Sequence, residues 1–90
     1  MPKVQKVQIV KQKKIQFSRE YNFNGEMKDY LEMREPTIGD EINAQEMARN
    51  DNEMQLLMFA NLCDVSLDEL KPVASKDGAL IAEAYQDFLS

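Results

Sequence analysis

The sequence predicts an α+β fold: a β-hairpin, with an optional third edge strand, followed by three to four α-helices. Two patterns predict this order. Apolar residues recur at every second position on both sides of Asn24-Gly25, the strongest short signal for a hairpin turn. Apolar residues at helical spacing then occupy the C-terminal half of the chain. A length of 90 residues allows one domain with a thin core.

Residues 1–14 are predicted to be a basic N-terminal arm or an edge strand. The arm contains β-forming valines, but the lysines between them are too dense for a buried strand. Residues 15–90 are predicted to form a single α+β domain. Within it we expect the hairpin over residues 15–35 and the helical part over residues 37–89.

Both strands of the hairpin carry their apolar residues at odd-numbered positions. A two-residue turn at Asn24-Gly25 would pair odd positions with even ones and put the two apolar sets on opposite faces. The sequence therefore predicts a three-residue loop over residues 24–26, with Gly25 in a left-handed conformation or in a bulge. The expected cross-strand pairs are Phe23 with Met27 and Phe17 with Met33.

The first helix is predicted to follow the proline that ends the second strand. Thr37 is a suitable N-cap, and Asp40 three residues later suits the start of a helix. We expect this helix over about residues 38–49, with Ile42 and Met47 facing inward. An Asn-Asp-Asn run at residues 50–52 then predicts a break.

The segment 54–63 is nearly apolar on all sides, since only Gln55 and Asn61 are polar. A helix of this composition is either the central core element or half of an interface. After it, Ser66 and Glu69 form a capping box that predicts one or two helical turns. The last helix is predicted near residues 76–89, with Ser75 as its cap.

The residues needed for catalysis are largely missing. The chain has no histidine, the commonest general base and metal ligand, and only one cysteine, Cys63. Its three glycines form no phosphate-binding pattern. We therefore expect no enzyme, no metal site and no cofactor. The single cysteine and the lack of an apolar leader or span indicate a cytoplasmic protein without a membrane partner.

Charge and methionine content point to a protein partner. Residues 1–20 carry six basic side chains and one acidic, whereas residues 21–90 carry five basic and fifteen acidic, so the body repels nucleic acid. Six methionines are many for this length, and methionine suits surfaces that accept varied apolar partners. The alternative is that they fill a loosely specified core. The predicted partner-binding residues are Met54, Leu57, Met58, Phe59 and Leu62.

The run from Leu31 to Asp40, LEMREPTIGD, resembles the strand-to-helix junction of the tail assembly chaperones of Mu-like phages and prophages. That junction has the pattern LxLREPT-x-x-D. Later features similar to the family lie at Leu56–Leu62, Ser66–Leu70, Asp77 and Phe88-Leu89. The chain departs from the family at Ser18-Arg19-Glu20, where members usually have a proline. The resemblance covers about residues 15–90.

The resemblance implies a non-enzymatic protein of the bacterial host cytoplasm that coats the tape-measure protein until the tail tube polymerises around it. It also implies a longer form made by ribosomal frameshifting, with which the short chain would act. A homo-oligomer is compatible with it. Two other functions stay open from the residues: a self-assembling structural subunit of a phage or bacteriocin tail, and a small nucleic-acid-binding regulator that uses the basic arm.

Overall fold

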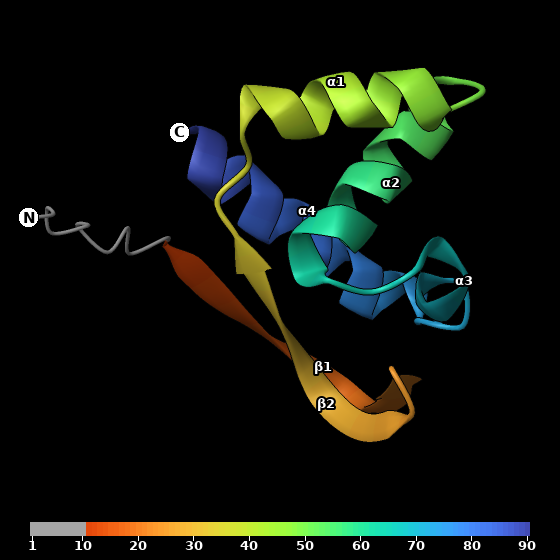
Figure 1. The fold of residues 1–90 in the computed structure, drawn as a ribbon. Helices are drawn as coiled ribbons and strands as arrows, with labels where there is room; N and C mark the ends of the chain where they lie inside the picture. The colour runs from red at the N-terminus through yellow and green to blue at the C-terminus, as the bar shows by residue number, and fades with distance from the viewer. Residues whose placement is uncertain (1–10) are drawn as a thin grey trace, which may run out of the picture.

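The computed structural model describes residues 11–90 and shows a two-stranded antiparallel hairpin followed by four helices, which confirms the predicted α+β class. Figure 1 shows the hairpin on one side of the molecule and the helices gathered on the other. The first ten residues of the predicted arm lie outside the described residues. The elements are β1 (Gln12–Phe23), β2 (Glu26–Arg34), α1 (Ile38–Met47), α2 (Asp51–Cys63), α3 (Leu67–Leu70) and α4 (Ser75–Leu89).

The hairpin loop has two residues, so the predicted three-residue loop is wrong. Phe23 pairs with Glu26 across Asn24-Gly25, and both turn residues have positive φ, 55° and 81°. Two positive φ values are what a type I′ turn requires, and its twist matches that of the strands. The expectation of a left-handed Gly25 is confirmed. The predicted pairs of Phe23 with Met27 and of Phe17 with Met33 are not formed; Met27 pairs with Asn22, and Met33 with Lys13.

A bulge in β1 resolves the conflict between the turn and the apolar pattern. Tyr21 pairs with Lys28 near the turn, whereas Gln16 pairs with Tyr30 farther along, so residues 17–20 lie opposite a single residue of β2. The three extra residues change the parity of the register, and odd positions pair with odd positions beyond the bulge. The apolar side chains of β1 therefore all reach the core. Met27 is left on the outside, 57% exposed.

The core lies between the inner face of the hairpin and helices α2 and α4. It contains the inward-facing apolar side chains of both strands, one small residue of α1, and the inward faces of the two longer helices. Three aromatic rings of β1 pack together, with the centroids of Phe17 and Tyr21 5.7 Å apart. The buried cluster consists of Ile15, Phe17, Tyr21, Phe23, Leu31, Met33, Ala44, Met58, Phe59, Leu62, Cys63, Ile81 and Ala84.

Helix α1 shows the opposite of its predicted orientation. Ile42 and Met47, expected to face inward, are exposed, whereas Ala44 and Asp40 are buried. The helix is short and pinned at its start by Asp40, and this fixes which side meets α2. The small Ala44 then allows α1 to approach the rest of the helical layer closely. A break between α1 and α2 is present as predicted, but it covers residues 48–50 rather than 50–52, so α1 ends two residues before its predicted end.

The junction between β2 and α1 is held by a charged clamp. Arg34 donates two hydrogen bonds to the carboxylate of Asp40, each of 2.8 Å. The backbone N–H and the hydroxyl of Thr37 also donate to Asp40, and the Asp40 N–H donates back to the Thr37 hydroxyl. The predicted cap at Thr37 is confirmed as a capping box. The clamp fixes the angle at which the chain leaves the sheet.

The clamp predicts a specific loss of stability in acid. The hydrogen bond from Arg34, followed by the bonds from Thr37, lowers the pKa of Asp40 from 3.8 to about 2. Because the folded-state pKa lies below the unfolded one, this stabilisation is complete above pH 4–5 and is lost as the pH falls through about 2. Arg34 is partly exposed, so after allowance for solvent screening we expect Asp40→Asn to cost about 1–2 kcal/mol at neutral pH.

Urea unfolding of the wild type and of Asp40→Asn between neutral pH and pH 2 measures this effect. Other carboxylates act equally in both proteins, so the difference between the two isolates Asp40. The difference should shrink toward zero at pH 2. An equal difference at both ends of the pH range would contradict the assignment.

The turn of the hairpin is tied to the loop before α3. The predicted capping box of Ser66 and Glu69 is present, and Glu69 also accepts the backbone N–H of Asn24. The side-chain amide of Asn24 donates to the carbonyl of Asp64 at 3.2 Å. Helix α4 begins one residue before its predicted start, with Ala74 rather than Ser75 at the N-cap and no side-chain cap. The contacts of Asn24 with Glu69 and Asp64 hold the turn of the hairpin against the helices.

Candidate functional site

The five residues predicted to bind a partner all lie on α2, but they are not all at the surface. Met58, Phe59 and Leu62 are buried in the core of the chain itself, while Met54 and Leu57 are half-buried against it. Their apolar character is thus largely used for folding. The most exposed apolar side chain of α2 is Leu56, which is 45% exposed.

Leu56 stands at the rim of an apolar groove between α2, α3 and α4. One wall is the face of α2 formed by Leu56 and Phe59, and the opposite wall is the face of α4 formed by Gly78 and Ile81. Residues three apart share a helix face, so each wall is one ridge of its helix. The groove has a volume of about 280 Å³. Its lining residues are Leu56, Phe59, Leu70, Val73, Ser75, Gly78 and Ile81.

Two of the residues that line this groove have polar or aromatic neighbours. The ring of Phe59 meets the ring of Tyr85 edge to face, with centroids 5.5 Å apart. Ser75 lies in the first turn of α4, where the N-cap residue Ala74 provides no side-chain acceptor. The same turn contains the carboxylate of Asp77, whose negative charge offsets the positive end of the helix dipole.

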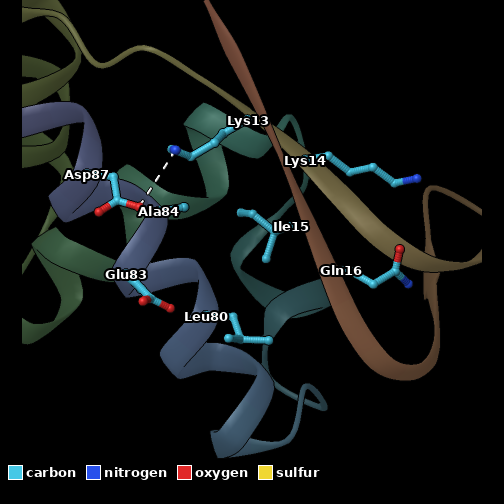
Figure 2. A pocket seen from close by; sticks show the side chains of 8 residues that line it. All are labelled: Lys13, Lys14, Ile15, Gln16, Leu80, Glu83, Ala84 and Asp87. Atoms are coloured by element: carbon cyan, nitrogen blue, oxygen red, sulfur yellow. Dashed lines mark ion pairs between the residues drawn. The ribbon is translucent and has the colours of Figure 1, made fainter.

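A second groove lies between β1 and α4 and has a mixed-charge lining. Figure 2 shows Lys13 of β1 reaching across to Asp87 of α4, and the two charged groups are 3.7 Å apart. Lys14, Gln16 and Glu83 add further polar groups. Lysines along a strand edge oppose the addition of another strand. This surface is thus better suited to solubility than to an apolar partner.

Further large apolar side chains are exposed outside the apolar groove. Ile38 and Ile42 lie one turn apart on the outer face of α1, and Ile38 is 75% exposed. Single exposed apolar side chains occur on most protein surfaces, so their exposure alone defines no site. The others among the described residues are Met27, Met47, Leu80 and Leu89.

Two carboxylates are buried among the described residues, and for Asp77, unlike Asp40, sequence reasoning found no structural role beyond its place in the family pattern. It lies on α4, is 1% exposed, and faces the bulge of β1. It accepts the Ser18 N–H at 3.0 Å, the Ser18 hydroxyl at 2.9 Å and the Tyr21 hydroxyl at 2.6 Å. The hydrogen bond from Tyr21 is the main cause of its lowered pKa. Asp77 therefore serves as an acceptor that holds the bulge.

Residues 11–90 contain neither a metal-binding cluster nor a reactive thiol. Within this range no three side chains of histidine, cysteine, aspartate or glutamate are grouped so that they could hold a metal ion. Burial raises the pKa of the Cys63 thiol to about 12, so it is not a nucleophile at neutral pH. In the same described part of the chain, no helix has the length and apolarity to cross a membrane.

The comparisons with known proteins identify the family. Residues 14–90 match the family described as "Phage tail assembly chaperone proteins, E, or 41 or 14". The chain belongs to this family of phage tail assembly chaperones, which are not enzymes. The resemblance noted at the strand-to-helix junction is thereby confirmed. No curated protein and no solved structure matches the chain.

Proposed function

We propose that this chaperone binds the tape-measure protein of the same phage and keeps it soluble in the bacterial host cell until the tail tube polymerises around it. Membership of the tail assembly chaperone family supports a tail protein as client. The tape-measure protein is the tail component that is long, helical and apolar, and such a chain aggregates when its apolar faces are uncovered.

The observation that carries the proposal is the apolar groove between α2, α3 and α4. It is open at the surface and lined by aliphatic and aromatic side chains, the composition that accepts the apolar face of a client helix. Met54 and Leu57 do not line it; both are partly buried against the core, and Met54 lines a separate hollow beside the connection between α1 and α2. Of the five residues first predicted to bind the client, we therefore retain Phe59, which lines one wall of the groove.

Co-expression with the tape-measure protein encoded beside it, followed by affinity capture, tests this function. We expect the tape-measure protein to move from the pellet to the soluble fraction and to co-purify with the chain. A matched control is the same co-expression with an unrelated small acidic protein. If the tape-measure protein stays insoluble with this chain and with any frameshifted longer form, and the chain is instead found in assembled tails, it is a structural subunit.

A further inference from the structure

The outer surface of α1 is both apolar and acidic. Ile38, Ile42 and Glu46 follow one another at intervals of four residues, so they form one stripe along the helix, on the side opposite the buried Ala44. Ile38 is 75% exposed and Ile42 is 49% exposed. Glu41 is also exposed and lies beside the stripe. We call the stripe together with Glu41 the α1 surface.

The carboxylates of the α1 surface have no cationic partner among residues 11–90. None of the ion pairs between described residues includes Glu41 or Glu46. Helix α1 itself contains no basic residue. Two exposed isoleucines beside two unpaired carboxylates are complemented by a segment that combines apolar and basic side chains.

The first ten residues of the chain have this composition. Their sequence, MPKVQKVQIV, contains Lys3 and Lys6 and no acidic residue. The rest of the chain is acidic overall, so these lysines are attracted to it. The large apolar side chains of this segment after Met1 are Val4, Val7, Ile9 and Val10.

The arm joins the fold close to the start of α1. The backbone N–H of Glu35 donates to the carbonyl of Lys11 at 3.1 Å, and α1 begins three residues later. A surface hollow of about 470 Å³, bordered by Lys11, Glu35 and Phe88, leaves room at this junction for the chain to turn. Ten residues span at most about 33–36 Å, whereas a helix of ten residues is about 15 Å long. The whole α1 surface is therefore within reach of the arm of the same copy.

We propose that residues 1–10 pack on the α1 surface of their own copy. The valines and the isoleucine of the arm cover the two exposed isoleucines of α1, and its two lysines meet the two unpaired carboxylates. The α1 surface is then not available to a second copy of the chain. This contact is separate from the apolar groove between α2, α3 and α4, because no residue that lines the groove belongs to α1 or to the arm.

Cross-linking of the wild-type chain with a water-soluble carbodiimide tests the contact directly, since this reagent joins an amine to a carboxylate only where the two touch. The protein is an equal mixture of isotope-labelled and unlabelled chains at low ionic strength. We expect mass spectrometry to find Lys3 or Lys6 joined to Glu41 or Glu46, with both halves of each cross-linked peptide from the same kind of chain. Mixed halves would show that the arm belongs to a second copy, which overturns the proposal. It is also overturned if neither lysine is joined to α1.

Substitution of the arm lysines tests whether the contact covers apolar area. In Lys3→Gln/Lys6→Gln, we expect the fluorescence of a dye that binds exposed apolar surface to rise roughly twofold at low salt, because the attraction that holds the arm is lost. High salt should raise the wild-type signal toward that of the variant, because screening weakens the same attraction. The matched control, Lys71→Gln/Lys76→Gln, makes the same change in net charge away from α1 and should leave the signal unchanged. An equal rise in both variants would trace the effect to net charge and overturn the proposal.

The partner substitution on α1 closes the test. Glu41→Gln/Glu46→Gln should raise the dye signal as much as the arm variant does, and the combination of both should raise it no further, because each breaks the same contact. Additive rises would mean that the arm and α1 act separately, and the proposal would fail. The cross-linking result decides if a variant loses its circular dichroism signal, because it needs no substitution. None of these measurements includes the tape-measure protein, so their failure leaves the proposed function untouched.

Discussion

Met58→Glu is expected to unfold the chain rather than merely abolish partner binding. Met58 is 2% exposed and lies in the core beside the hairpin. Among the described residues no cationic side chain is buried, and a buried unpaired charge costs about 4 kcal/mol or more. A 90-residue domain has roughly 5–13 kcal/mol of stability in total. The loss of the helical signal in circular dichroism and of cooperative melting measures this outcome.

Leu56→Glu is the matched control on the same helix. Leu56 is nearly half exposed, so the carboxylate stays in water and stability should change by less than about 0.5 kcal/mol. This variant should stay folded but capture less tape-measure protein, because the charge stands at the rim of the groove. A folded Met58→Glu with normal melting would show that α2 presents its methionine face outward and that the described core is wrong.

The different burial of Leu56 and Met58 could not be predicted from the sequence of α2. Composition identified it as core or interface, but a helix apolar on all sides has no polar face to show which residues point outward. Leu56 and Met58 are both large apolar residues, so residue type does not show which of them is exposed. Only the positions of the hairpin and α4 decide between them, and no local pattern encodes those positions.

Local signals predicted the helix ends better than the helix faces. The N-cap at Thr37 and the capping box at Ser66 were correctly predicted, because capping depends on side chains within three residues. The orientation of α1 was predicted wrongly, because an isoleucine such as Ile42 is expected in the core although it is exposed here. The partly exposed Arg34–Asp40 clamp sets that orientation, and no local pattern in the sequence indicates that these two residues pair.

The bulge in β1 explains both the error in the hairpin and a departure from the family. The apolar pattern excluded a simple two-residue turn with regular pairing, and this reasoning was sound, but the extra residues lie in the strand rather than in the loop. They fall on Ser18-Arg19-Glu20, where family members usually have a proline. Proline is tolerated at bulges, since the backbone there is not part of the ladder. A bulge in β1 is therefore compatible both with Ser18-Arg19-Glu20 in this chain and with the proline of other family members.

Removal of the carboxylate that holds this bulge is expected to have the second large effect. In Asp77→Ala, the Ser18 N–H and the Tyr21 hydroxyl lose their buried acceptor, and β1 loses its polar attachment to α4. Leaving such donors unsatisfied is more costly than never having them. We expect the melting temperature to fall by roughly 10 °C or more, and the Ser18 amide to lose its protection from hydrogen exchange.

Two further variants test whether the lost hydrogen-bond acceptor causes the loss of stability in Asp77→Ala. Asp77→Asn keeps one oxygen for the Ser18 N–H, while its amide can donate to the two hydroxyls, which rotate to accept. It should therefore lose less stability than Asp77→Ala. Tyr21→Phe removes one donor and the acceptor of the Ala74 N–H, at 3.1 Å, but leaves both bonds from Ser18 in place. We expect the order wild type, Asp77→Asn, Asp77→Ala in melting temperature, with Ser18 still protected in Tyr21→Phe. Equal melting of Asp77→Ala and the wild type would mean that apolar packing alone holds the bulge against α4.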